Sequence, residues 1–546
     1  MDKRTFIALF AVVILFFVWS TFLAPKSQPA APKQATAADS TKPVADTSLA
    51  QAAAPTQAAV PDSLIRGADS LRTLTLANGN FTVKFSNEGA SIRSIELKKF
   101  SWADKVTPVD LVPRDRDLAG ISLLNQQASP PLDLKSVIWQ HAQSDSAVTF
   151  WLGEQASPWV KKTYKLDHKY GILMDVSVSS PEPVYGIAYD FSAGIADSEK
   201  IKPRYKDQDY KLLLFSENAL AKLNLAKIKK EPPQGDLSSF KWAALRTKYF
   251  TVAIQETGTV LTSHYSASAA RDTGNPAIVF DSRDRSPSQN WQQQFLIYAG
   301  PADYDLMKSY PESKLELIPE RGPGWLRWLS NAIAWLLKLL HSFIPNYGVV
   351  IIIFSLILKI VLHPLTKKSM DANLKMQRIQ PQVQEIQTKY KSNPQQMQQE
   401  LSKLYKEAGA SPMSGCLPLL LQMPIFIALY NALRSTLDMR NAKFVGWLQD
   451  LSEPDPYLVL PIIMAIFMII QSLMTRPSKE ALAKMDEKQQ AMQQSTKMMT
   501  WLMPIMMFFI FRGLPSGLVL YYTVFNILSV AHQYYTQKRL KQKETA

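Results

Sequence analysis

Apolar residues are distributed unevenly along the 546 residues of the chain. Positions 71–319 tend to alternate apolar and polar residues with a period of two, whereas long apolar runs occupy residues 5–23 and recur from Trp325 onward. Alternation is typical of strands that bury one face, and apolar runs of about 18 residues or more are typical of membrane-crossing helices. The pattern therefore predicts a water-exposed β domain joined to a helical membrane part.

The β part opens with a hairpin signature. Alternating apolar residues flank the turn dipeptide Asn78-Gly79; they are Leu74 and Leu76 before it, and Phe81, Val83 and Phe85 after it. The alternation returns at 164–166, 174–178 and 291–298, and no long helical pattern interrupts it. Residues 71–319 are therefore predicted to form an antiparallel β-sandwich of short strands, with a helix beginning over 303–308.

The first apolar run, Thr5 to Leu23, follows Lys3 and Arg4 and carries no charge. At about 1.5 Å per residue it is long enough to cross about 30 Å of hydrocarbon. A cleaved signal peptide is the alternative, but the run is long for one, and its end at Pro25 lacks a small-x-small cleavage pattern. We predict an uncleaved transmembrane anchor over 1–23 and a flexible linker over 24–70, which is rich in Ala, Pro, Gln, Ser and Thr.

Residues 320–343 contain an amphipathic helical pattern. The predicted apolar face consists of Trp325, Trp328, Leu329, Ile333, Leu336, Leu339, Leu340 and Phe343, and the polar face of Arg327, Asn331, Lys338 and His341. Tryptophans opposite basic residues favour a helix that lies in the membrane–water interface. The alternative, a crossing helix, would reverse the orientation of every later loop.

Five further spans are predicted after the interfacial helix. The second span of the chain occupies 344–366, and spans three to six lie within 411–535, at 416–433, 457–473, 498–511 and 517–535. The run 498–511 is short, which implies that the bilayer thins there or that Lys497 and Arg512 snorkel to the headgroups.

Basic residues set the orientation of these spans. With the N-terminus inside, segments 1–4, 366–409, 476–497 and 536–546 are cytosolic and hold nineteen Lys and Arg residues, whereas the short outside loops hold four. Because cytosolic loops carry the excess of basic residues, we predict six spans in a bacterial inner membrane, with both termini and the basic tail 536–546 in the cytosol. The β domain then lies in the periplasm. The same placement accounts for the formal net charge of +15 without nucleic-acid binding.

Little in the sequence suggests covalent or metal chemistry. Cys416 is the single cysteine and lies in an apolar run, so neither a disulfide nor a thiolate metal site is predicted, and a small buried hydrophobe is its simplest role. His141, His168 and His264 are scattered, and we find no nucleophile–base pair and no nucleotide-binding loop. The sequence therefore predicts no catalytic residue, no metal and no cofactor.

Lys359 is the most informative residue of the second span. A charge at that depth is costly unless it pairs or meets water, so Lys359 is a candidate functional residue; the alternative is that it snorkels to the cytosolic headgroups. The later spans offer no acidic partner, which favours a hydrated cavity. Other polar residues in the spans are candidates for lining it, although each alone fits an interhelical hydrogen bond: Ser355, Gln422, Asn431, Gln471, Thr523 and Asn526.

The cytosolic segment 367–410 is predicted to be a coiled helical hairpin. Apolar seams repeat at heptad spacing on two helices, with Met376, Ile379, Val383, Ile386 and Tyr390 on the first and Met397, Leu401, Leu404 and Ala408 on the second. Asn393-Pro394 supplies the start of the second helix, Gly409 ends it, and Pro381 kinks or restarts the first. The hairpin is either an inert spacer or, as its methionines favour, an interaction arm.

Three ordered motifs resemble those of the YidC/Oxa/Alb insertase family. Residues 415–430 (GCLPLLLQMPIFIALY) resemble the third span, residues 514–522 (LPSGLVLYY) the start of the last span, and His363-Pro-Leu-Thr366 the exit of the first conserved span. The N-terminal anchor and the β domain resemble the long form of this family in bacteria with two membranes. The resemblance implies a five-span core around a hydrophilic groove open to the cytosol and to lipid.

The resemblance also implies a function without covalent chemistry. A membrane protein insertase or chaperone of this kind moves short polar segments of nascent membrane proteins through the groove and releases their apolar segments into the bilayer, alone or with the Sec translocon and the ribosome. The basic groove residue corresponds to Lys359, where many members carry arginine, so the charge is kept here but the bidentate guanidinium is not. Ser355, Gln422, Tyr521, Tyr522 and Asn526 fall where groove or client contacts are expected.

Two other classes of protein remain alternatives. A secondary transporter of a small anion would use Lys359 but needs inverted repeats and intramembrane acids, neither of which the sequence contains. A membrane-anchored periplasmic interaction scaffold needs one span and not six. No small-molecule substrate is expected for the insertase.

Overall fold

The computed structural model describes residues 70–545 except 103, 125–130, 200–205, 208, 217–218, 238–239, 258–261, 272, 311–312, 321, 391, 410–416 and 475–500. The predicted anchor 1–23, nearly all of the linker 24–70, Cys416 and the start of the predicted fifth span lie outside the described residues. The chain divides into two compact units, the first ending at Gly300 and the second beginning at Pro301.

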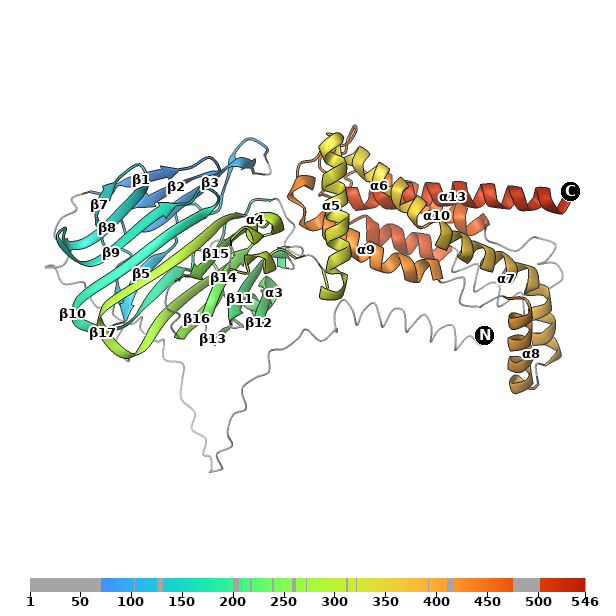
Figure 1. Ribbon diagram of the computed structural model, residues 1–546, viewed down its shortest axis with the longest axis horizontal. Helices are drawn as coiled ribbons and strands as arrows, with labels where there is room; N and C mark the ends of the chain where they lie inside the picture. Colours follow the sequence, from blue (N-terminus) through green and yellow to red (C-terminus); the bar gives the residue numbers. More distant parts are fainter. Residues whose placement is uncertain are drawn as a thin grey trace, which may run out of the picture. The chain divides into compact units, whose positions relative to one another are not determined.

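The first unit is a β domain of two antiparallel sheets (Figure 1). The smaller sheet has the order β1-β2-β3-β4, with β1 (Thr73–Ala77), β2 (Phe81–Ser86), β3 (Ser91–Ser101) and β4 (Pro108–Asp110). The main path of the larger sheet is β12-β11-β14-β15-β17-β10-β9-β8-β7, and β5, β6, β13 and β16 lie off this path. The predicted β-sandwich is confirmed.

The larger sheet includes strands from most of the domain. Their bounds are β5 (Gly120–Leu124), β6 (Leu132–Asp133), β7 (Gln140–Gln143), β8 (Ala147–Glu154), β9 (Ser157–Leu166), β10 (Gly171–Phe191), β11 (Lys211–Ser216), β12 (Ala219–Asn224), β13 (Gln234–Leu237), β14 (Phe240–Arg246), β15 (Phe250–Glu256), β16 (Thr262–Ala269) and β17 (Pro276–Pro301). The short helix α3 (Leu225–Lys230) accompanies the strands of this unit.

The hydrophobic core of the domain lies between the two sheets. The alternating residues Phe81, Val83 and Phe85 of β2 are fully buried, and the Phe85 ring lies 4.7 Å from the ring of Tyr164 on β9. Burying side chains of this size contributes about 1.5–3 kcal/mol each. The period-two pattern therefore predicted both the strand and its inward face.

The expectation of uniformly short strands was wrong for β10 and β17, which have 21 and 26 residues. They pair from Gly171 opposite Tyr298 to Phe191 opposite Ile278, with register shifts between Ser179 and Gly186 (Figure 1). Pro181 and Pro183 lie in this irregular stretch. Proline removes a ladder hydrogen bond and so suggests the end of a strand, but bulges let these strands continue.

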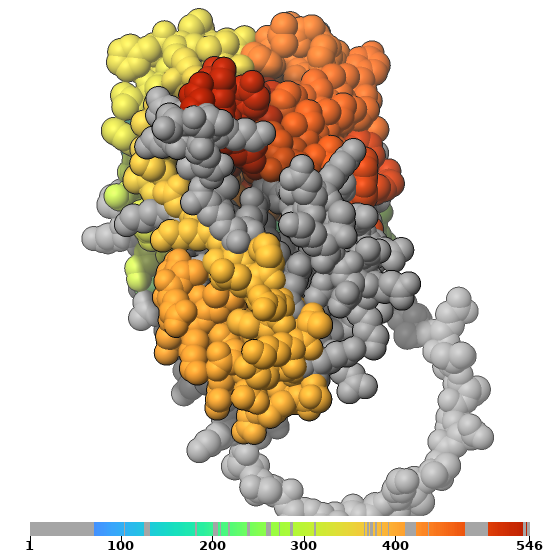
Figure 2. Space-filling view, turned by 90° about the vertical axis from the view of Figure 1, so that its right-hand side faces the viewer, coloured from blue at the N-terminus to red at the C-terminus, as the bar shows by residue number. Residues whose placement is uncertain are grey.

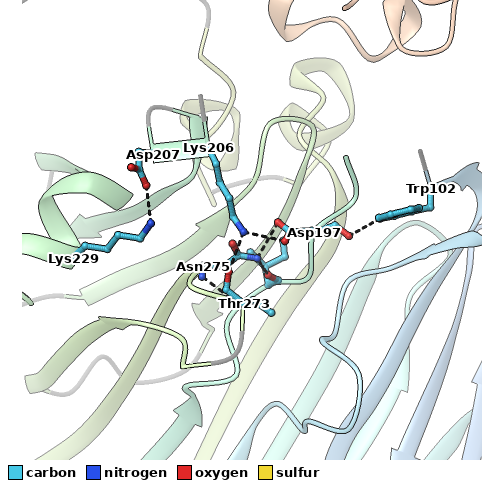
Figure 3. A network of polar contacts seen from close by, with 8 residues as sticks. Trp102, Asp197, Lys206, Asp207, Lys229, Thr273 and Asn275 are labelled. Atoms are coloured by element: carbon cyan, nitrogen blue, oxygen red, sulfur yellow. Dashed lines mark hydrogen bonds and ion pairs between the residues drawn. The ribbon is translucent and has the colours of Figure 1, made fainter. Parts of the chain in front are cut away.

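A polar network joins the segment before β11 to the turn before β17 (Figure 3). Lys206 Nζ donates to Asp197 Oδ2 at 2.9 Å and to the Thr273 carbonyl at 3.0 Å. Asn275 Nδ2 contacts Asp197 Oδ1 at 3.2 Å, and the Trp102 indole donates to the Asp197 carbonyl at 2.9 Å. Lys206 neutralises the charge of Asp197. The network therefore has a structural role: it holds these loops together.

The second unit is helical (Figure 1). Its helices are α4 (Tyr304–Lys308), α5 (Arg327–Phe343), α6 (Tyr347–Val361), α7 (His363–Lys389), α8 (Pro394–Glu407), α9 (Leu417–Ser435), α10 (Val459–Met474) and α13 (Ser516–Thr545), with the 3₁₀ turns η3 (Leu315–Leu317), η4 (Gly324–Leu326) and η6 (Leu437–Met439). Residues 501–511 are also helical. No helix among the described residues is both long and apolar enough to cross a membrane.

Helix α5 has two apolar faces where the sequence suggested one. Ile333 and Leu337 are buried within the unit, whereas Trp328 and Trp335 are 68% and 64% exposed. His341, assigned to the polar face, stacks on Tyr347 with ring centroids 3.7 Å apart. The single-face prediction was wrong because helical spacing cannot distinguish residues that face protein from residues that face outward.

Helices α7 and α8 form the projection expected for 367–410. They contact one another, and Figure 2 shows them, in yellow to orange, extending away from the other coloured helices of this unit. The predicted seam residues are all at least half-buried, with Val383 the most enclosed at 4% exposure. Pro381 lies inside α7, so the helix continues through it as a single element.

Candidate functional site

Lys359 lies in the last turn of α6. Asn346 caps the start of the helix: its side chain accepts hydrogen bonds from the Gly348 and Val349 amides at 2.9 and 3.2 Å. At the other end, Lys359 Nζ donates to Ser529 Oγ of α13 at 2.7 Å and lies 4.5 Å from the centroid of the Phe525 ring. The lysine therefore points toward another helix of the unit.

The partners of Lys359 are neutral. Ser529 Oγ donates its own proton to the Phe525 carbonyl at 2.7 Å, which leaves a lone pair to accept from the ammonium. The Phe525 ring supplies a cation–π contact. The sequences of α6, α9 and α10 contain no Asp or Glu, and the only one in α13 is Glu544, four turns beyond Ser529. The positive charge is thus held by a hydroxyl and an aromatic face.

A chain of contacts leads from Lys359 to Gln422 of α9. The Phe525 ring lies 5.8 Å from the ring of Tyr521, and Gln422 Nε2 donates to Tyr521 Oη at 3.0 Å. Tyr522 meets Tyr521 edge to face at 5.2 Å. The structure therefore brings Lys359, Gln422, Tyr521 and Tyr522 into one connected group across three helices.

The remaining predicted polar residues have more local partners. Four of them donate to backbone carbonyls: Ser355 to Ile351, Asn431 to Ile427, Thr523 to Val519 and Leu460, and Asn526 to Tyr522. The Thr523 bond to Leu460, at 3.3 Å, ties α13 to α10. Gln471 is half-buried in α10. These contacts are those of polar residues that stabilise helices, and a lining role for them stays a prediction.

Sequence reasoning missed Phe525 and Ser529. They follow Tyr521 at four-residue spacing, so the three side chains share one face of α13. That spacing was the available signal, but a serine and a phenylalanine in an apolar helix have no distinctive chemistry of their own. One turn beyond Lys359, the rings of His363 and His532 also meet, at 4.8 Å.

The opposite end of the unit is closed by the loop 436–458. Asn346 Nδ2 donates to the Phe444 carbonyl at 3.2 Å, and the amides of Ser516 and Gly517 donate to the carbonyls of Glu453 and Leu451 at 2.7 and 2.9 Å. The starts of α6 and α13 are therefore fixed to one loop. Lys359 lies at the far end of α6 from this loop, about 18 Å along the helix axis.

Comparisons with known proteins bear on both units. A family described as "60Kd inner membrane protein" matches residues 339–544, and one described as "YidC periplasmic domain" matches residues 73–336. These families define a class of inner membrane protein that carries a periplasmic domain.

Similar relatives cover the whole chain. "Membrane protein insertase YidC" of Geobacter metallireducens is 31% identical, with all of both chains covered, and that of Prosthecochloris aestuarii is 30% identical over 98% of this chain and 95% of the relative. A solved structure described as an active YidC insertase is 20% identical and covers 87% of this chain and 94% of its own, with a TM-score of 0.36. The chain belongs to the YidC family of membrane protein insertases.

Proposed function

We propose that this chain inserts nascent membrane proteins into the bacterial inner membrane through a hydrated groove beside Lys359. The observation that carries the proposal is the placement of the lysine, whose ammonium lies between helices on a hydroxyl and an aromatic ring. A charge without a carboxylate partner in these helices attracts water and acidic groups. The polar end of a nascent segment would therefore be dehydrated less at this site than in lipid.

The mechanism is physical and involves no covalent step. A short polar segment of the client occupies the groove near Lys359, Gln422 and Tyr521, while its apolar stretch slides along exposed apolar side chains into lipid. Such residues occur on α10 and on 501–511, among them Ile462, Ile466, Ile505 and Phe509. Lipid release then requires only that the apolar stretch prefer hydrocarbon to the groove.

The membrane arrangement forms part of the proposal. Six spans, with both termini in the cytosol and the β domain in the periplasm, follow from the positions of the basic residues. In this arrangement α7 and α8 extend into the cytosol, where the ribosome and emerging clients are found, and α5 lies in the periplasmic interface. Cooperation with the Sec translocon is proposed because the chain belongs to the insertase family.

Insertion into liposomes that contain only the purified chain tests the proposal. A small single-span client with an acidic N-terminal segment should insert with the parent and fail with Lys359→Ala. Lys367→Ala, which removes an exposed lysine of α7, is the matched control and should insert normally. Deletion of 374–408 tests the hairpin separately. If empty liposomes acquire the client as well as loaded ones, the insertase proposal fails.

A further inference from the structure

We infer that Ser529 and Phe525 hold Lys359 in a resting position and thereby set how strongly the site prefers acidic client segments. The inference rests on the proposed function and assigns it two further residues. Neither side chain carries a charge. Among the described residues, Ser529 accepts a hydrogen bond from the Lys359 ammonium, and the Phe525 ring makes a cation–π contact with it.

The hydrogen bond to Ser529 is suited to exchange. The serine proton is directed to the Phe525 carbonyl at 2.7 Å, so the hydroxyl can only accept from the lysine. A carboxylate accepts a stronger, charge-assisted hydrogen bond from an ammonium than a neutral hydroxyl does. An acidic client group therefore displaces Ser529, whereas an amide or hydroxyl of similar size gains little over it.

The chemistry of lysine fits this role. Its ammonium is a compact charge on a flexible four-carbon stem, whereas arginine presents a rigid planar fork. A lysine at 359 can swing from Ser529 to a client carboxylate while its ammonium stays near the Phe525 ring. The ring keeps the charge partly compensated during the exchange because a cation–π contact does not require one fixed hydrogen-bond direction.

The test compares two clients that differ only in Asp or Asn residues of the translocated segment. Insertion of both into liposomes with the full-length chain gives an acid-preference ratio. Ser529→Ala should raise the ratio by about threefold or more, because the resting contact is lost. Ser529→Asp supplies a permanent counter-ion and should bring the ratio near one. Phe525→Leu, which removes the cation–π contact, should change the ratio as well.

Thr536→Ala is the matched control. Thr536 makes the same kind of bond, to the carbonyl of His532 four residues earlier at 2.9 Å, but has no contact with Lys359 among those described. Its loss should leave the ratio unchanged. Equal effects of the Ser529 variants on both clients would show a merely structural role and overturn the inference. The proposed function fails separately, if the parent itself does not insert either client.

Discussion

At the scale of single residues, two alanines of the β domain adopt left-handed backbone conformations, Ala90 with φ 47° and Ala119 with φ 62°. Such a conformation costs a residue with a Cβ roughly 1–2 kcal/mol. Both carbonyls accept hydrogen bonds from buried side chains of β9: Ala90 from Tyr164 Oη at 2.9 Å, and Ala119 from Lys162 Nζ. The core strand therefore holds both turns in place.

Lys162 should make the stability of this domain depend on pH. Burial lowers the pKa of Lys162 from its ordinary 10.5 to about 7. Between these values the unfolded chain keeps the proton and the folded chain does not, so stability rises with pH and the gain is lost as pH falls toward 7. Lys162→Met should remove this pH dependence, which amounts to about 5 kcal/mol of unfolding free energy over the whole window.

Urea unfolding of the full chain in detergent, read by protease resistance of the β domain at pH 7 and 9.5, measures the slope. Lys165→Met is the control, since Lys165 is an exposed lysine on the same strand. As the pH falls, the free energy of unfolding of the parent should decrease relative to that of Lys162→Met. Parallel behaviour of the two chains would show that the buried lysine does not titrate in this range.

Single functional residues could be predicted from the sequence only where the side chain is chemically unlike its neighbours in the chain. Lys359 was detected because a charge interrupts an apolar run, and a charge in such a place needs a partner or water. Ser529 was not, because serine in a helix most often bonds to its own backbone, and it does so here as well. Its second contact comes from a residue 170 positions away and depends on tertiary packing.

At the scale of elements, the junction between α6 and the loop 436–458 depends on a glycine. A Cβ at Gly348 would overlap the base of the Phe444 ring. Gly348→Ala should therefore destabilise this junction by about 1–3 kcal/mol, as overpacking does. Thermal unfolding of the helical unit in detergent measures this loss as a lower Tm.

The double variant Gly348→Ala/Phe444→Ala separates crowding from helix propensity. Removing the ring makes room for the new methyl group, so the two changes should cost less together than the sum of their separate effects. Gly324→Ala is the control, because a Cβ there meets no atom within 4 Å. Additive costs in the double variant would exclude the steric account.

Helix α8 offers a test of local capping. Asn393 Oδ1 accepts from the Gln396 amide at 3.2 Å, at the start of a helix with no fully buried residue. Asn393→Ala should cost about 1 kcal/mol, seen as faster hydrogen exchange of the Gln396 amide. Ser392→Ala, at the exposed neighbouring position, should leave that exchange unchanged. Exchange that is equally fast in both variants would show that the cap is not limiting.

Helices and strands were predicted correctly from the sequence where a single local pattern determines both the type of element and its buried face. The hairpin β1–β2 formed as expected, with Leu76 opposite Val83, because alternation fixes both strand and face. The turn uses Asn78 Oδ1, which accepts from the Asn80 and Phe81 amides. The lengths of β10 and β17 and the two faces of α5 were not predicted, since each depends on what the rest of the fold packs against them.

At the scale of the whole molecule, the family and the two-part organisation were predictable, because ordered motifs and the change from period-two to apolar runs are properties of the sequence. The group around Lys359 was predictable only in part. Lys359 and Gln422 were named from their chemistry, and Tyr521 and Tyr522 from the family resemblance. That Gln422 bonds Tyr521 while Thr523 bonds a backbone carbonyl depends on how three helices are rotated. Rotation of helices is set by packing that no single pattern encodes.

The single cysteine makes the membrane arrangement directly testable. In a Cys416→Ser background, cysteines placed at Gln155, Ser392 and Gln449 report on the β domain, the hairpin and the loop 436–458, all at exposed positions. An impermeant maleimide added to spheroplasts should label Gln155→Cys and Gln449→Cys, and should label Ser392→Cys only after lysis. This result follows if α5 lies in the interface, because an interfacial helix leaves the charge-determined orientation of the later spans intact. If α5 crossed the membrane, positions 392 and 449 would exchange their labelling while 155 kept its own, so the three sites together separate a wrong orientation from a failure of labelling.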